Sequence, residues 1–466
     1  MPDYVPNDPH EYELESIILS TQRNAHDVDI TTSMVELEIF EHLDRAYLTG
    51  SLTFVDGGRV IEIIDFQGTE YVDIQLKLHN TSHRVVKRFI VRQVNSIVPS
   101  TDTTDVVTLA LIDYDAYYSS LVNVNKMYEG KPSKIIGDIL RDNYGSSKRV
   151  SRAGEANILQ EQNWDTASEI PEVAAQAITK STSYELQSAF RYIVPNLTPL
   201  EAIEVIKKRT TGLTGTPFFC FASLADNNFR FFDLYTLIQQ PPINVDGPYF
   251  YSGQLTQSLP SSGSDLSKSI SHMKTPKNAN TLELIGNGDV GALYEFVDTT
   301  HGLEFNVAYD LDKVMKNLLQ TNAYPAADTR TTFNEIPISE YKSKRVHKIA
   351  TANTYYDSRN IYEESSASKH AAKSIQKSVR NLLGKSILEI TVPGLNFMPQ
   401  GGHKTIGRTL SVVSIADITQ HREIYDRKRS GDYLVYASKH SFTQDRYSVG
   451  LSLVKIANYR GNTAVR

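Results

Sequence analysis

The sequence is poor in the residues that build disulfide scaffolds, metal centres and membrane spans. Its 466 residues include one tryptophan and one cysteine, Cys220, so it cannot form an internal disulfide framework or a multi-cysteine metal site. It lacks a run of about 18 apolar residues, which excludes a membrane-spanning helix. The first residues, MPDYVPNDPHEYELES, are acidic and interrupted by proline, unlike a signal peptide. We therefore expect no stable membrane insertion, and synthesis in a reducing cytoplasm.

Charge is also nearly balanced. The formal net charge is -6, which gives no support for a surface that binds nucleic acid over its whole extent. The hydrophobic content of 40% is sufficient for packed cores, and the length exceeds what a single core usually holds. We expect a folded protein of several domains.

Catalytic and cofactor motifs are scarce. A G-x-G-x-x-G pattern occurs at 286–291, directly after the strand-like segment Thr281–Ile285. A dinucleotide site needs a helix that opens inside this motif, whereas Tyr294 and Phe296 favour a strand. We interpret the motif as a glycine turn and keep a nucleotide-binding enzyme as an alternative.

Two further residues have reactive side chains, and we expect both to have structural rather than catalytic roles. Cys220 lies between two phenylalanines and is expected to be a core thiol, and His440 lies inside a predicted strand. We predict that the protein is not an enzyme and has no catalytic, cofactor-binding or metal residues.

Alternating hydrophobicity is abundant near both ends of the chain. Leu37 and Ile39 alternate with Glu36 and Glu38, and similar patterns follow up to residue 113. The segment after Ser386 is again strand-like, and its last strand runs through Tyr447. Period-two patterns predict sheets with one buried face, and the first set fits a small antiparallel barrel or sandwich.

The middle of the chain, 191–240, predicts a helix followed by an aromatic hairpin. Thr198 and Glu201 form a capping box around Pro199. Phenylalanines then flank an Asp/Asn turn on both sides. One hairpin cannot bury its own face, so we expect 216–240 to pair with strands beyond Ser386.

Other helices are predicted at 115–121, within 128–145, near 308–320 and at about 365–383. The last carries a row of basic residues at helical spacing, Lys369, Lys373, Lys377 and Arg380. This row is either a plain solvated face or a candidate partner-docking face for an acidic neighbour. The polar segment 146–170, a possible short helix at 171–180 and the Ser/Lys-rich segment 241–280 are expected to be exposed insertions.

The order of features in 191–240 resembles the centre of baseplate hub proteins of contractile-tailed bacteriophages. These features are a V-P-N-x-x-P helix start, a Gly/Thr turn, an aromatic strand, an Asp/Asn turn and a returning strand. The hub part of type VI secretion spike proteins is similar. Pro393-Gly394-Leu395, the PQGG turn and the GDYLV strand extend the resemblance over about 11–457.

The resemblance implies a β-rich α+β fold, with two small antiparallel β-barrel tube domains and insertion domains of helices and loops. The first barrel would be 11–125 and the helical insertion 126–215. The second barrel would be split into 216–245 and 365–457, around an insertion at 246–364 and before a tail at 458–466. Candidate channel-facing residues are Glu36, Glu38 and Asp73.

The resemblance also implies a structural role in the virion. Three chains would form a hollow ring that adapts the sixfold tail tube to the trimeric central spike, and DNA would pass through it without sequence-specific binding. Implied partners are the tail tube or tube-initiator protein, the spike, the tape-measure protein and a baseplate wedge. The ring would lie in the tail baseplate after assembly in the host cytoplasm. A different baseplate or receptor-binding component is the other alternative.

Overall fold

The fold is seen in a computed structural model of the chain. It describes residues 10–21, 27–64, 66–77, 84–144, 190–211, 215–225, 229–239, 242–244, 247–252, 267–277, 281–298, 303–311, 314, 332–341, 345–349, 367–383, 387–398, 405–417, 424–426 and 429–458. Within these residues the protein is rich in β-strands, and most of them join one large, mainly antiparallel sheet.

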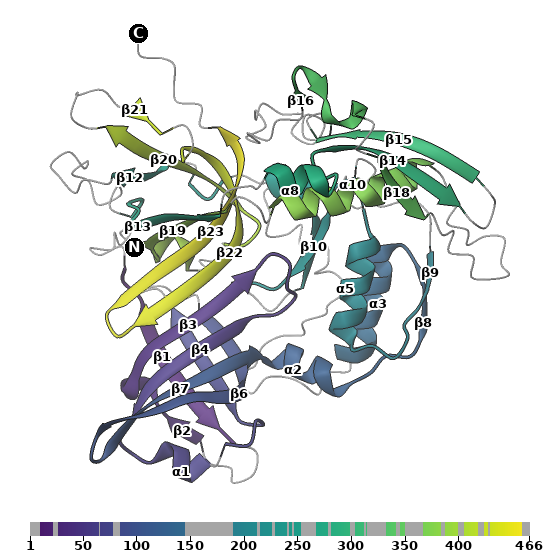
Figure 1. Cartoon of the computed structure of the whole chain (residues 1–466). Helices are drawn as coiled ribbons and strands as arrows, with labels where there is room; N and C mark the ends of the chain where they lie inside the picture. The colour runs from purple at the N-terminus through teal and green to yellow at the C-terminus, as the bar shows by residue number, and fades with distance from the viewer. Residues whose placement is uncertain are drawn as a thin grey trace, which may run out of the picture.

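Two groups of strands build this sheet. The N-terminal group consists of β1 (Glu13–Ser20), β2 (Asp27–Asp29), β3 (Met34–His42), β4 (Thr49–Asp56), β5 (Tyr71–Lys77), β6 (Arg84–Thr101) and β7 (Thr104–Asp113). The C-terminal group consists of β12 (Tyr249–Ser252), β13 (His272–Lys277), β19 (Ile387–Pro393), β20 (Thr409–Asp417), β21 (Ile424–Tyr425), β22 (Gly431–Thr443) and β23 (Arg446–Asn458). Figure 1 shows the two groups meeting where β3 lies beside β22.

The pairing of β3 with β22 makes one sheet of 14 strands. Its main path runs β13-β19-β23-β22-β3-β4-β7-β6-β5-β1-β2, and β20 branches from β22. Among the described residues, the pairings do not close either group into a separate barrel. The predicted β-rich fold is confirmed in this coarser form.

The alternation in the sequence explains which side of the sheet carries the core. On β3, Leu37 and Ile39 are fully buried, while Glu36 and Glu38 lie on the opposite side and are only half-buried. The pairing register sets His440 opposite Ile39 and Ser441 opposite Glu38. Burial of each large apolar side chain contributes roughly 1.5–3 kcal/mol, so a one-residue slip of this register is strongly disfavoured.

The aromatic hairpin β10 (Phe218–Phe221) and β11 (Arg230–Asp233) forms its own two-stranded sheet. The prediction that it pairs with strands beyond Ser386 is wrong for the described residues. The reason is that its two faces pack into two different cores. Phe219 and Phe221 join the core of the large sheet, whereas Phe218 and Cys220 join a second core formed with α3 and α5. The hairpin is therefore held by side-chain packing on both faces, without a ladder to strands beyond Ser386.

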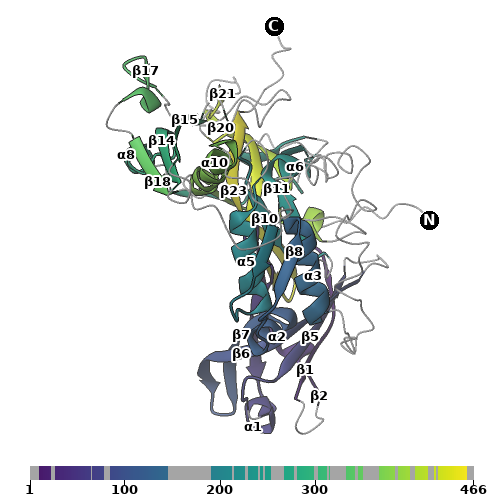
Figure 2. The same cartoon turned by 90° about the vertical axis from the view of Figure 1, so that its right-hand side faces the viewer.

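Four predicted helices are present. They are α2 (Tyr114–Leu121), α3 (Pro132–Tyr144), α5 (Pro199–Arg209) and α10 (Ala367–Leu383). The capping box of Thr198 and Glu201 on α5 is confirmed. Short elements complete this part, namely η1 (Thr31–Ser33), α1 (Val60–Ile64), β8 (Met127–Gly130), β9 (Phe190–Ile193), α6 (Leu234–Gln239) and η5 (Leu395–Phe397). Figure 2 shows α3, α5 and β10 between the N-terminal strands at one end and β20 and β21 at the other.

The segment between the two parts of the C-terminal group holds a three-stranded sheet of β14 (Gly291–Asp298), β15 (Leu303–Asp310) and β18 (Arg345–Ile349). Near it lie α8 (Thr281–Gly286), β16 (Thr332–Phe333), β17 (Ile336–Pro337) and η3 (Ile338–Glu340). One prediction is wrong here, and another is shifted at its start. Residues 281–285 are helical rather than strand-like, because Leu284 packs on Val290 and Ile338 while Leu282 stays exposed. Residues 308–310 end β15, whereas Leu311 and Val314 are helical, so the helix predicted near 308–320 begins later than expected.

Part of the predicted loop 241–280 belongs to the large sheet. β12 pairs with β20, β13 pairs with β19, and Ile270 is buried in the main core. The loop assignment is therefore wrong for 249–252 and 272–277, because short strands with few buried residues give little periodic signal; residues 271, 272, 274 and 275 are exposed as predicted. The segments 146–170 and 171–180 and most of the tail at 458–466 lie outside the described residues.

Candidate functional site at the seam between the two strand groups

We call the pairing of β3 with β22 the seam. It runs in antiparallel register from the His42–Ala437 pair to the Glu36–Thr443 pair. On its inner side lie Glu41, Ser438 and His440, which are all buried. The seam therefore places a carboxylate from one strand group and an imidazole from the other inside the shared core.

These side chains form a closed hydrogen-bond network. Glu41 Oε2 lies 3.0 Å from His440 Nε2 and accepts from Ser438 Oγ at 2.6 Å. Its other oxygen accepts from the Leu224 amide at 2.5 Å, just beyond β10. On the far side of the imidazole, His440 Nδ1 lies 2.8 Å from the Tyr447 hydroxyl. The network thus joins β3, β22, β23 and the end of the aromatic hairpin.

The electrostatics favour a charged carboxylate at Glu41. Burial alone would raise the pKa of Glu41, but the charge and hydrogen bond of His440 outweigh it, with hydrogen bonds from Ser438 and the Leu224 amide, so the pKa lies below its usual range. Burial, and then the Glu41 charge, raise the pKa of Tyr447 well above its ordinary value. Because Glu41, His440 and Tyr447 have at most 1% exposure, this network is shielded from solvent and holds the strands together.

A second polar cluster lies just beyond the seam, in the turn after β3. Asp44 Oδ1 is 2.8 Å from Lys207 Nζ on α5 and 2.5 Å from Arg380 Nη1 on α10. Arg380 also donates to the Phe218 carbonyl, and its guanidinium lies 4.9 Å from the Phe219 ring centre. Burial would raise the pKa of Asp44, but Lys207 and Arg380 lower it below its usual value. This cluster ties the seam to both long helices.

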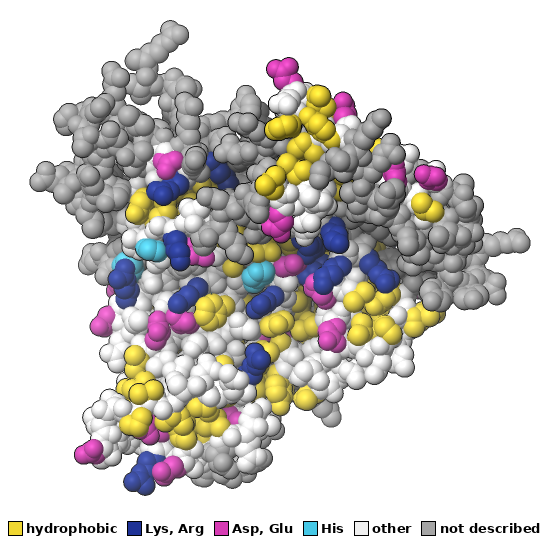
Figure 3. Space-filling view, in the orientation of Figure 1, with side chains coloured by type: hydrophobic (Ala, Val, Ile, Leu, Met, Phe, Trp, Pro, Cys, Tyr) yellow, Lys and Arg dark blue, Asp and Glu magenta, His cyan; other side chains and the backbone are white. Residues whose placement is uncertain are grey.

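The outer face is the side of the large sheet opposite the core, and it is polar near the seam. Lys439 forms an ion pair with Glu38, and Ser441 Oγ donates to Glu36 Oε1 at 3.0 Å. Asp73 lies on the same side, on β5, and pairs with Arg88 through two hydrogen bonds of 2.6 Å. Figure 3 shows basic and acidic side chains interspersed over the middle of this region. All three predicted channel-facing acids are thus on the outer face and partnered; their channel role stays a prediction.

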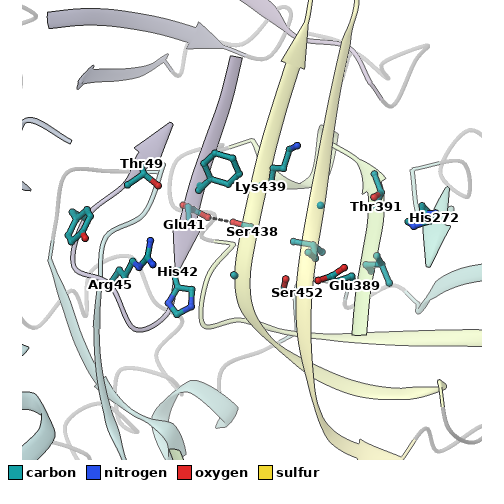
Figure 4. A pocket seen from close by; sticks show the side chains of 16 residues that line it. Glu41, His42, Arg45, Thr49, His272, Glu389, Thr391, Ser438, Lys439 and Ser452 are labelled. Carbon is teal, nitrogen blue, oxygen red and sulfur yellow. Dashed lines mark hydrogen bonds between the residues drawn. The ribbon is translucent and has the colours of Figure 1, made fainter. Parts of the chain in front are cut away.

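A groove of about 440 Å³ crosses the outer face where six strands lie side by side. Figure 4 shows Thr49, His42 and Arg45 at one side, Ser438 and Lys439 in the middle, and Glu389, Thr391 and His272 at the other side. The lining includes residues of both signs and several hydroxyls. A groove of mixed charge suits water and transient polar contacts better than tight retention of a polyanion.

The structure places the predicted docking row on α10 only in part. Lys377 is exposed, whereas the Arg380 guanidinium turns inward to Asp44 and its side chain is 15% exposed. The side chains of Lys369 and Lys373 lie outside the described residues. Docking through this row remains a prediction. Arg380 has a structural role, because it forms the inward ion pair with Asp44.

The glycine loop at 286–291 follows a helix and precedes a strand, the reverse of the order that a dinucleotide site needs. Two buried tyrosines hold it. Tyr309 donates to the Asp289 carbonyl at 3.0 Å, and Tyr294 donates to the Gly288 carbonyl at 3.3 Å. The loop is therefore a braced turn between α8 and β14.

Cysteine and metal-ligating side chains form no alternative site in the described part of the chain. Burial raises the pKa of the Cys220 thiol to about 12, as expected for a core residue. Within the described residues, no group of His, Cys, Asp and Glu has the geometry to hold a metal ion. The helices in that part of the chain are too short or too polar to cross a membrane.

Sequence reasoning did not place Glu41, Asp44, Lys207 or Tyr447 in buried polar clusters. One signal was available, since Glu41 continues the inward register of Leu37 and Ile39 and so places a carboxylate in the core. A buried carboxylate needs partners. Ser438 and His440 lie 397 and 399 residues further along the chain, and the Leu224 amide lies 183 residues further. No local pattern identifies them.

No family model matches the sequence, and no curated protein matches it either. Solved structures do match. The 43 kDa tail protein of prophage MuSo2 from Shewanella oneidensis is 13% identical with a TM-score of 0.47, covering 95% of this chain and 98% of that one. A tail protein from Neisseria meningitidis is 10% identical with a TM-score of 0.48, covering 96% and 97%. A component of the type VI secretion system of E. coli is 10% identical with a TM-score of 0.40, covering 98% and 81%. These three solved structures are two tail proteins and a secretion-system component.

Proposed function

We propose that the protein is the baseplate hub of a contractile phage tail, a structural virion component without enzymatic activity. Three chains form a hollow ring, and each strand group supplies one barrel-like unit of its wall. The ring joins the sixfold tail tube to the trimeric spike and lets DNA pass during ejection. Contacts with the tape-measure protein and the baseplate wedge belong to the same proposal.

One observation carries this proposal. Both strand groups share a continuous sheet whose inner face is apolar and whose outer face is polar and charge-paired near the seam. A channel for a polyanion should not hold phosphates, and on this face Glu38 neutralises Lys439 and Asp73 neutralises Arg88. Glu36, Glu38 and Asp73 are therefore our candidates for the channel wall. This favours a hub over a receptor-binding component, which needs an exposed recognition surface rather than a neutralised wall.

The test is the size and shape of the purified protein. Light scattering should give about three times the chain mass, as expected for the closed symmetric assemblies that most homo-oligomers form. Negative-stain images should show an open ring. A protein that stays monomeric at high concentration, and that forms no ring in tail particles, would contradict the proposal. A thermal shift with nucleotides would instead favour the enzyme alternative.

A further inference from the structure

The groove on the outer face results from the pairing register of the strands beneath it. One row of directly paired residues crosses four strands and consists of His42, Ala437, Ser452 and Glu389. The row beside it consists of Phe40, Lys439, Gly450 and Thr391. Ala437, Gly450 and Ser452, in the middle of these rows, have small side chains and form a floor between taller neighbours. The groove volume of about 440 Å³ is within the roughly 300–1,000 Å³ typical of small-ligand sites.

The end of the groove next to the seam carries two hydrogen-bond donors. His42 Nδ1 accepts from the Asp44 amide at 3.0 Å, so the proton of the neutral ring lies on Nε2. Burial, followed by the Arg45 charge, lowers the pKa of His42 and thus favours this neutral form. Arg45 is exposed, and its guanidinium forms no ion pair with the described residues. Figure 4 shows both side chains on the same side of the groove, where they are available to donate to a carboxylate.

The opposite end of the groove carries an acceptor. Glu389 on β19 is half-buried and forms no ion pair with the described residues, although the exposed Lys274 lies directly opposite it in the register of β13. His272 lies at the same end and is exposed. The other charged side chains of the lining already have partners, which are Glu38 for Lys439 and His440 for Glu41. Among the described residues, Arg45 and Glu389 are thus the cation and the anion of the lining that have no ion-pair partner.

The distance between the two ends fits an extended peptide. His42 and Glu389 are three strand spacings apart, which is about 14 Å between their backbones. An extended chain advances about 3.3 Å per residue, so residues i and i+4 are about 13 Å apart and point to the same side. An acidic and a basic side chain at this spacing reach the two ends together. A free amino acid is too short to do so, and the carboxylate of Glu389 repels a polyanion.

We propose that this groove binds an extended peptide segment with an acidic and a basic side chain four residues apart. The acidic side chain accepts from Arg45 and from His42 Nε2, and the basic side chain pairs with Glu389. The peptide backbone crosses the floor, where the hydroxyls of Ser452 and Thr391 are available to its amide groups. All parts of the groove come from one chain, so this inference is independent of the hub proposal.

Isothermal titration calorimetry of the full-length chain tests the proposal. The probe is a pentapeptide capped at both ends, with glutamate first, lysine fifth and alanine or serine between them. We expect saturable binding of one peptide per chain, weakened at least about tenfold by Arg45→Ala and by Glu389→Gln. Ser452→Leu fills the floor without removing a charge and should weaken binding as much. The matched control is Arg92→Glu, which changes an exposed arginine elsewhere on the large sheet and should bind as the unchanged chain does.

A change of specificity provides the sharpest test. Arg45→Glu places a carboxylate at both ends of the groove. This variant should therefore lose the glutamate–lysine probe and bind instead a pentapeptide with lysine at both positions. Thermal unfolding of each variant should match that of the unchanged chain, as expected for positions outside the core. The arginine variants and the peptides decide the question even if Ser452→Leu does not fold.

Several results would overturn the proposal. These are the absence of saturable binding, equal binding of a peptide whose two charges are adjacent, unchanged binding by Arg45→Glu or by folded Ser452→Leu, or equal loss in Arg92→Glu. Displacement of the probe by a short thymidine oligonucleotide would assign the groove to nucleic acid and also reject the proposal.

Discussion

The carboxylate of Asp44 lies 2.8 Å from the ammonium of Lys207, a side chain that is 1% exposed. Removing the carboxylate leaves Lys207 with Glu204 as its remaining ion-pair partner and Arg380 with the Phe218 carbonyl. We expect Asp44→Asn to lower the free energy of unfolding by about 1.5–3 kcal/mol, the range for a lost hydrogen bond to a charged group. Chemical denaturation checks this value. Asp138→Asn is the control, because it breaks a pair with the half-exposed Arg141 and should cost less than about 1 kcal/mol.

The same carboxylates predict how stability depends on pH. The pKa values of Glu41 and Asp44 are lowered in the folded protein. Their stabilising contribution is complete above the unfolded values of about 4 and is lost as the pH falls through the folded values. The free energy of unfolding should therefore fall below about pH 5, and fall less steeply in Asp44→Asn. Denaturation curves over a pH series test this, and a flat or rising trend toward acid would refute it.

Tyr447 supplies the hydroxyl beside His440 Nδ1. Tyr447→Phe leaves the imidazole nitrogen buried without that partner, which should cost about 1–3 kcal/mol. Tyr341→Phe removes an exposed hydroxyl and should change the free energy of unfolding by less than about 0.5 kcal/mol. Equal effects in the two variants would mean that the buried network adds nothing to stability.

Gly394 lies against the ring of Tyr447. A Cβ at this position would be 2.0 Å from Tyr447 Cδ1, and Tyr447 is fully buried. Gly394→Ala should therefore displace the ring and cost about 3 kcal/mol. Gly58→Ala, where a Cβ meets nothing within 4 Å, should have little effect. Thermal unfolding of the two variants measures the difference, and a Gly394→Ala protein as stable as the control would contradict the packing described here.

The sequence predicted the elements whose signal is local. The capping box fixed the start of α5, and alternation fixed which side of β3 faces the core. The hairpin was predicted as a hairpin, but its partners were not, because Phe218 and Phe219 point into different cores. The sequence of an aromatic run does not show which core each side chain joins.

The site was less predictable than the fold for a related reason. The lysine row on α10 was recognised from its spacing, yet spacing could not show that Arg380 turns back to Asp44. The contact depends on where the turn after β3 lies in space. The strand predicted at 281–285 from its composition is also wrong. There the packing of Leu284 on Val290 favours a short helix over the local β propensity.

The seam also sets an order of events during synthesis. Glu41 and His440 are 399 residues apart, so β3 emerges from the ribosome about 20 to 80 seconds before its partner strand. During that time one edge of β3 has no strand beside it and could join a neighbouring chain. Glu36, Glu38 and Glu41 all lie on this strand, and an inward carboxylate makes a wrong apolar partner costly. Glu41, which stabilises the seam in the folded protein, thus also disfavours wrong pairing of β3 in the nascent chain until β22 has been synthesised.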